Sequence, residues 1–109
     1  MKITKQLRIS KTPQPPYYSV TTTATLNSDI SGYFRLAETL LESAQQIQGF
    51  LGLEACLDKE CGIAVSYWTS LEAIENWRRH GGHQQAKALA KERWFENYIT
   101  RIAKVEQVY

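Results

Sequence analysis

The two histidines of the chain stand three residues apart in the segment 77–83, which reads WRRHGGH. On an unbroken helix His80 and His83 would share one face and could hold one metal ion between them. However, two consecutive glycines cost about 2 kcal/mol relative to alanines inside a helix, so Gly81-Gly82 is expected to interrupt it. No carboxylate or cysteine accompanies the pair closely. We therefore expect no metal site here, and we interpret the segment as a kinked joint between two helical pieces.

His83 is the candidate catalytic residue of the chain. An imidazole that titrates near neutral pH inside an aromatic pocket can orient a substrate hydroxyl or accept its proton. The alternative is a purely structural role. In that case His80 stabilises the C-terminal end of one helical piece as a cation, while His83 begins the next turn and plugs the pocket or faces solvent.

Large aromatic side chains gather in the sequence on both sides of these histidines. They could line a slot for a flat ligand, or they could form ordinary core and interface packing. Arg101 lies in an otherwise apolar row, where it could pair with Glu54 or Glu72 or anchor an anion in the pocket. Because neighbouring strand residues point to opposite faces, Tyr67 and Trp68 can line one pocket only if the strand end bulges. The candidate pocket residues are Tyr67, Trp68, Trp77, Trp94, Tyr98 and Arg101.

The composition indicates one soluble globular domain. The chain has 109 residues, of which 43% are apolar and 22% charged. A net charge of +2, with scattered basic residues and no recognisable motif, does not indicate nucleic acid binding. No apolar run approaches the ~20 residues of a membrane span, and the first residues lack the apolar centre of a secretion signal, so we expect a cytoplasmic protein without membrane association.

Cys56 and Cys61 have no second pair of ligands, which makes them a poor zinc signal and favours two small apolar residues near a hairpin.

The order of the expected elements gives the fold class. Residues 1–16 contain three prolines in four positions and are expected to form an N-terminal arm, followed by one domain over 17–109. Thr69 and Glu72 form a capping box, which begins a helix that runs to about His80. The expected elements are strand 17–26, helix 30–47, strands 50–57 and 62–68 joined as a hairpin, the helix from Thr69 with its second piece beyond the glycines, and strand 99–108. This β-α-β-β-α-β order predicts a ferredoxin-like α+β domain, with an antiparallel four-stranded sheet and both helices on one face.

The face of the sheet without helices is expected to be mixed in character. Water could cover such a face, and so could a second copy of the chain. The residues expected on it are Thr21, Thr23, Thr25, Glu54, Ser66, Thr100, Lys104 and Glu106.

Three segments resemble the antibiotic biosynthesis monooxygenase (ABM) domain family of the dimeric α+β barrel superfamily. They read GFLGLEACLD at 49–58, GIAVSYWTSLEAIENWRRHGGHQQA at 62–86 and ERWFENYITRIAKVEQVY at 92–109, and the resemblance covers about 17–109. The most specific part is the pattern YW-x-S-x-E-A-I-x-x-W, which begins at Tyr67. The resemblance implies a homodimer whose two sheets pack through their helix-free faces, with a pocket between helices and sheet in each subunit.

The same resemblance implies a choice of activities. Some members oxidise polycyclic aromatic substrates with molecular oxygen and neither metal nor cofactor, others bind and degrade haem, and many have no established activity. The haem-degrading members use an asparagine on the first strand, a tryptophan that ends the third strand and a histidine on the second helix. Trp68 matches the tryptophan, whereas Asn27 falls in a turn and Lys87 takes the histidine position, with His83 one turn earlier.

We therefore expect a cofactor-independent monooxygenase that acts on a small aromatic or quinone-like compound. The alternatives are a non-catalytic dimeric module that binds a small molecule, and a haem-degrading monooxygenase that uses His83 as a shifted ligand.

Overall fold

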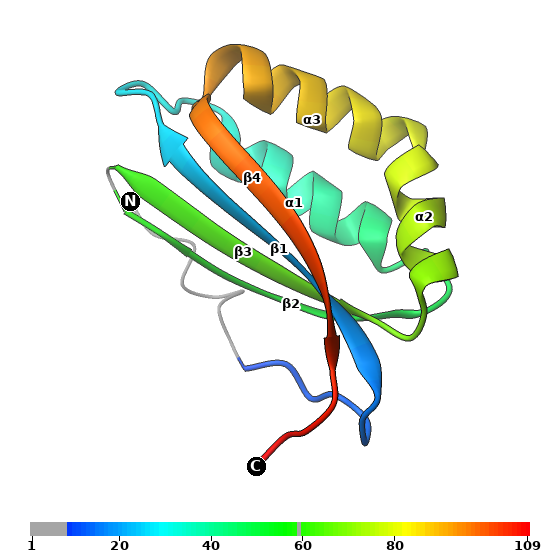
Figure 1. Ribbon diagram of the computed structural model, residues 1–109. Coiled ribbons are helices and arrows are strands. Elements are labelled where there is room, and N and C mark those ends of the chain that lie inside the picture. Colours follow the sequence, from blue (N-terminus) through cyan, green and yellow to red (C-terminus); the bar gives the residue numbers. More distant parts are fainter. Residues whose placement is uncertain (1–8, 59) are drawn as a thin grey trace.

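The computed structural model describes residues 9–58 and 60–109 (Figure 1). One antiparallel sheet carries all the described strands, in the order β2-β3-β1-β4, and the helices lie together on one of its faces. The predicted ferredoxin-like α+β fold is confirmed, with the second helix divided in two. The elements are β1 (Tyr17–Leu26), α1 (Tyr33–Ala44), β2 (Phe50–Leu57), β3 (Cys61–Trp68), α2 (Leu71–Arg79), α3 (Gly81–Arg93) and β4 (Phe95–Val105).

The core lies between the helices and the end of β3. Trp68 is 0% exposed and packs with Ala44 of α1 and with Ala73 and Ile74 of α2. Its indole Nε1 donates a hydrogen bond to the Ser66 hydroxyl at 2.8 Å, which satisfies the one polar atom of the ring. The predicted end of the third strand is therefore the centre of the core.

The alternation predicted for β1 is confirmed, because Tyr18 and Val20 pack on this core. The register then assigns the faces of the neighbouring strands. Val20 lies opposite Ser66 and Ile102, so those two residues share the helix-covered face.

Three residues expected on the helix-free face are therefore on the other side. Ser66, Thr100 and Lys104 lie opposite Val20, Thr22 and Tyr18 and face the helices. The alternation within a strand does not determine its register against β1, and a slip of one residue exchanges the two faces of a strand.

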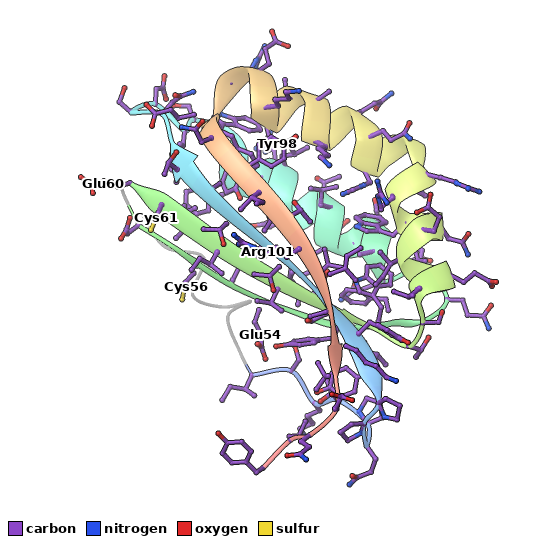
Figure 2. All side chains as sticks on the ribbon, viewed as in Figure 1. Glu54, Cys56, Glu60, Cys61, Tyr98 and Arg101 are labelled. Atoms are coloured by element: carbon purple, nitrogen blue, oxygen red, sulfur yellow. The ribbon has the colours of Figure 1, made fainter. Side chains whose placement is uncertain are left out.

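The helix-free face is more apolar than expected. Ile63 and Ile99 lie opposite Thr23 on its two sides and are 45% and 49% exposed. Figure 2 shows that Glu54, Cys56 and Cys61 also project away from the helices. The apolar residues Ile63, Val65, Ile99 and Ala103 thus lie among threonines on this face.

The start of α2 differs by one residue from the prediction. Ser70, not Thr69, is the N-cap, and its hydroxyl accepts a hydrogen bond from the Ala73 amide at 3.0 Å. The Thr69 amide instead donates to the Gly49 carbonyl at 2.9 Å, which ties the α2 entry to the turn before β2. Glu72 falls in the first turn, where its charge favours the helix dipole.

The predicted kink in the second helix is present, but the helix is interrupted at His80, one residue before the glycines. His80 is extended, with φ −62° and ψ 128°, and it ends α2 and begins α3. Its Nδ1 accepts a hydrogen bond from the Gly82 amide at 3.2 Å and so caps α3. Gly81 and Gly82 form the first turn of α3, where amides have no partner within the helix and a side-chain cap decides where the helix begins.

Both ends of the last strand are corrected, since the strand stops at Val105 and not at 108. The last strand begins at Phe95 and not at 99, because α3 ends at Arg93.

The described part of the arm, 9–16, has neither helix nor strand, and it lies against the helix-free side of β2, where the Ser10 amide donates to the Glu54 carboxylate at 2.9 Å. Residues 1–8 of the predicted arm lie outside the described residues. Within the described part of the chain, no helix has the length and apolar character needed to cross a membrane.

Candidate functional site

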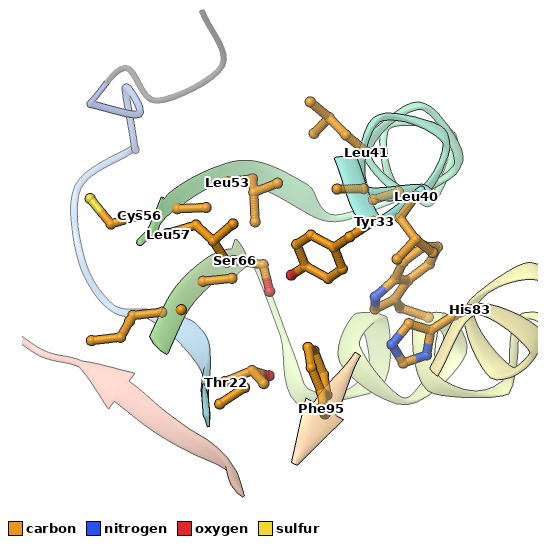
Figure 3. Close-up of a pocket in the computed structure, with 18 of the residues that line it drawn as sticks. Thr22, Tyr33, Leu40, Leu41, Leu53, Cys56, Leu57, Ser66, His83 and Phe95 are labelled. Atoms are coloured by element: carbon orange, nitrogen blue, oxygen red, sulfur yellow. The ribbon is translucent and has the colours of Figure 1, made fainter. Parts of the chain in front are cut away.

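A cavity of about 190 Å³ lies between the sheet and the helices (Figure 3). Its walls come from β1, β2, β3 and α1, with Trp77 of α2, His83 of α3 and Phe95 of β4 closing one side. No lysine, arginine, aspartate or glutamate is among the described residues that line it. An apolar cavity without fixed charge favours an uncharged ligand, because an ion inside it would lose its hydration without gaining a partner.

Trp68, Trp77 and His83 meet at this cavity. The rings of Trp68 and Trp77 are stacked with centroids 6.1 Å apart, and the His83 ring lies 4.7 Å from Trp77. The break at His80 lies between the two residues, with Trp77 in α2 and His83 in the first turn of α3. His80 also stacks on Trp77, at 5.6 Å, so the indole packs against both imidazoles.

The environment of His83 keeps its imidazole uncharged at neutral pH. Burial is the largest influence and lowers the pKa of His83 below its ordinary value of 6.5, and the positive charges of Lys87, His80 and Arg78 lower it further. An interaction with the Arg78 backbone opposes the shift. The Nδ1 atom is buried and has no hydrogen-bond partner among the described residues. A neutral imidazole in a cavity wall can accept or share a proton with a bound molecule through a ring nitrogen that the molecule reaches.

Three hydroxyl groups interrupt the apolar lining, on Tyr33, Ser66 and Thr22. None of these three residues is among the pocket residues predicted from the sequence. Strand alternation could have found Ser66 and Thr22, because Ser66 stands two residues before Trp68 and Thr22 two residues after Val20. Tyr33 had no such signal, since its place depends on where α1 crosses the sheet.

Tyr67 and Arg101 lie away from this cavity, on the helix-free face, opposite Ser19 and Thr21 of β1. The Tyr67 hydroxyl donates to the Glu54 carboxylate at 2.7 Å, and burial together with this carboxylate raises the pKa of Tyr67 to about 12. No ion pair joins Arg101 to Glu54 or to Glu72 within the described residues. The strand end does not bulge in the way that would bring Tyr67 beside Trp68.

Trp94 and Tyr98 lie on the helix side without lining the cavity. Trp94 is buried, and its Nε1 donates to the Ser31 carbonyl at 2.9 Å. The Tyr98 ring packs on Phe95, and the Lys87 ammonium lies 5.7 Å from its centre. Of the predicted site residues, the structure thus brings His83, Trp68 and Trp77 together at the cavity.

The thiols of Cys56 and Cys61 are free and exposed. Within residues 9–58 and 60–109, no three side chains of His, Cys, Asp or Glu lie close enough together to hold a metal ion.

Comparisons with known proteins give a consistent picture. Residues 29–89 match a family model described as antibiotic biosynthesis monooxygenase. The protein YqjZ of Bacillus subtilis (strain 168), described as uncharacterized, is 42% identical over 100 residues, which cover 91% of this chain and 88% of that protein.

Solved structures resemble the fold at low sequence identity. One is SnoaB from Streptomyces nogalater, described as a cofactor-independent oxygenase, with a TM-score of 0.75, 8% identity and coverage of 86% of this chain and 97% of that one. Another is Rv0793 from Mycobacterium tuberculosis, with a TM-score of 0.72, 11% identity and coverage of 85% and 99%. At such identities the likeness concerns the fold alone.

Proposed function

The chain belongs to the antibiotic biosynthesis monooxygenase family, and we propose that it is a monooxygenase that oxidises a small aromatic or quinone-like compound with molecular oxygen, without metal or flavin. The observation that carries the proposal is the neutral, half-buried imidazole of His83, packed on Trp77 at the edge of an apolar cavity. SnoaB, which shares the fold, is described as a cofactor-independent oxygenase.

The proposed chemistry needs a base, a flat binding surface and a dry cavity. His83 accepts a proton from an acidic C–H or O–H group of the substrate, and the electron pair of that bond remains on the substrate as a delocalised anion. The anion is electron-rich enough to reduce molecular oxygen. For a substrate with a reacting CH₂ group, one oxygen atom stays on that carbon as a carbonyl and the other leaves as water.

The lining supports an aromatic ligand. The ring of Trp77, backed by the fully buried ring of Trp68, offers flat apolar surface, and Leu53, Leu40 and Phe95 complete the walls around it. Because no described residue places a fixed charge in the lining, the substrate is expected to enter uncharged and to ionise only in contact with His83.

Oxygen uptake by the purified protein tests the proposal. A panel of hydroquinones and anthrones should include at least one compound that accelerates uptake, and His83→Ala and Trp68→Phe should both lower that rate while leaving the assembly state unchanged. If both variants turn over at the wild-type rate, His83 and Trp68 take no part in the reaction.

A non-catalytic binding module is the second candidate. His83 carries the one imidazole among the described residues of the lining, and a cavity that uses this imidazole only to hold a ligand would have the same geometry. This candidate predicts that aromatic compounds are retained by the protein with no oxygen uptake for any compound of the panel.

Haem degradation fits the cavity less well. Lys87, at the position of the expected haem ligand, lies over the Tyr98 ring and not in the cavity, and none of the described lining residues is a cation that would pair with haem carboxylates. A haem titration should therefore give no Soret shift that saturates at one equivalent per chain.

We also propose that the helix-free face pairs with a second copy of the chain. Ile63, Val65, Ile99 and Ala103 leave apolar area there that water covers poorly. Pairing through this face would leave the cavity, on the opposite side of the sheet, complete within each subunit.

A further inference from the structure

Tyr33 places a rigid hydroxyl group at the cavity. Its ring meets those of Phe34, Trp94 and Phe95 at centroid distances of 5.8, 5.5 and 6.0 Å. Trp94 is itself held by the hydrogen bond from its Nε1 to the Ser31 carbonyl. Aromatic neighbours fixed in this way leave the Tyr33 ring little freedom, so the position of its hydroxyl is set before any ligand arrives.

The Tyr33 hydroxyl has no hydrogen-bond partner among the described residues, and it keeps some accessible surface, since His83 Nδ1 is the one buried unpaired side-chain polar atom among them. A phenol in such a place normally binds water or a ligand, because an unmet donor is costly. Burial raises the pKa of Tyr33 above its ordinary value of 10, so the group stays protonated and acts as a donor at physiological pH.

Ser66 supplies a second donor on the facing wall. Its oxygen already accepts a hydrogen bond from Trp68 Nε1 at 2.8 Å, so the hydroxyl proton is left to point elsewhere. Figure 3 shows the hydroxyls of Tyr33 and Ser66 directed into the same part of the cavity, with His83 on another side. The cavity therefore presents donors in one place and a neutral imidazole in another.

We propose that Tyr33, assisted by Ser66, donates a hydrogen bond to an acceptor oxygen of the bound molecule and so selects uncharged ring compounds that carry a carbonyl or phenolic oxygen. In the proposed reaction, negative charge moves onto this oxygen as His83 removes the proton, and the two donors stabilise it. The stabilisation of this charge by the two donors rests on the proposed function, whereas their role in binding does not.

The binding role is tested without oxygen, by quenching of tryptophan fluorescence with two probes of matched shape. The probes are α-tetralone, which has a ketone oxygen, and tetralin, which lacks it. In the Tyr33→Phe variant the ring packing is kept and only the hydroxyl is lost. The ratio of the tetralone affinity to the tetralin affinity should fall about fivefold to tenfold relative to the wild type, with tetralin binding unchanged.

Tyr18→Phe is the matched control, because Tyr18 packs on the Trp68 cluster without lining the cavity. Its affinity ratio should equal that of the wild type. The proposal is overturned if Tyr33→Phe keeps the wild-type ratio within twofold, if it weakens both probes equally, or if the wild type binds neither probe.

The experiment separates this inference from the proposed function. A lower affinity ratio in Tyr33→Phe, together with no oxygen uptake by the wild type for any compound, would support Tyr33 as a binding residue and contradict the proposed oxygenase activity. An unchanged affinity ratio, together with oxygen uptake that His83→Ala abolishes, would support the oxygenase activity and contradict the binding role of Tyr33.

Discussion

His83 gains its chemical character from where its side chain lies, between the ring of Trp77 and the cavity. Because burial lowers its pKa, the imidazole at neutral pH is uncharged and has one ring nitrogen without a proton. The proton it takes from a substrate would make it a cation near Lys87 and Arg78, which disfavour a further positive charge. Such a base returns its proton readily, which suits a group that must be neutral again for the next turnover.

The first prediction concerns the pH dependence of turnover. The value of kcat/KM should fall as pH decreases through the lowered pKa of His83, below 6.5, and should be constant above it. Lys87→Gln removes a charge that lowers this pKa, so the acid limb should move to higher pH, while Lys91→Gln, one turn further along α3, should leave it in place. An acid limb that persists unchanged in His83→Gln would show that another group titrates.

The second prediction concerns stability and has the same physical origin. The folded protein binds a proton at His83 less readily than the unfolded chain does, so the free energy of unfolding should decrease as pH falls from about 6.5 through the folded pKa. Urea unfolding at several pH values should show a weaker dependence in this window for His83→Gln than for the wild type. Equal slopes for the two proteins would mean that His83 has the same proton affinity in both states.

At the scale of elements, the approach of α2 to the turn before β2 requires a glycine. Gly49 has φ 98°, and a Cβ atom there would lie 2.7 Å from Ala73 Cβ and 2.7 Å from Thr69 Oγ1. The hydrogen bond between the Thr69 amide and the Gly49 carbonyl fixes this approach. The same contact places α2, and with it Trp77, over the end of the sheet.

The third prediction compares two glycine substitutions. Gly49→Ala combines backbone strain with a steric clash and should lower the free energy of unfolding by about 2 kcal/mol or more. Gly81→Ala lies in the first turn of α3 with nothing within 4 Å, and should be neutral or stabilise by up to about 1 kcal/mol. Urea unfolding of both variants measures the difference, and similar effects of the two substitutions would contradict the assigned role of Gly49.

The elements that depend on local pattern were predictable, and those that depend on distant partners were not. The alternation of β1, the hairpin and the amphipathic α1 follow from nearby residues. In contrast, Ile63, Val65 and Tyr67 showed a clear alternation that does not by itself tell which face of the sheet they occupy. Only the register against Thr23, Thr21 and Ser19 of β1 decides that.

The residues of the candidate site divide in the same way, into those that local sequence indicates and those that depend on distant partners. His83, Trp68 and Trp77 were selected from residue type and spacing, and they do meet at the cavity. Tyr33 was not selected, because its position depends on the packing of α1 against Trp94 and Phe95, far away in the sequence. The break at His80 depends on a side-chain cap, and glycine content indicated it only to within a residue.

For the whole molecule, the sheet has apolar residues on both faces and helices on one. Part of the helix-free face is occupied by the chain itself: the Ser10 amide and the Tyr67 hydroxyl bind the two oxygens of Glu54, and Thr12 is hydrogen-bonded to Tyr17. The arm thereby covers the end of the face near β2. The area around Ile63 and Ile99 stays open, and half-exposed isoleucines on a flat sheet favour contact with another apolar surface.

The fourth prediction is that the protein sediments as a dimer at micromolar concentration and that this face forms the contact. Ile99→Glu adds a charge within the open area, on the edge strand β4, and should yield monomers, since a buried unpaired carboxylate costs several kcal/mol. Leu71→Glu changes an equally exposed leucine, at 55%, on α2, and it should sediment as the wild type does. Since the cavity lies on the other side of the sheet, monomeric Ile99→Glu should still bind α-tetralone. A wild-type protein that sediments as a single chain would contradict the pairing and leave the open isoleucines without a partner.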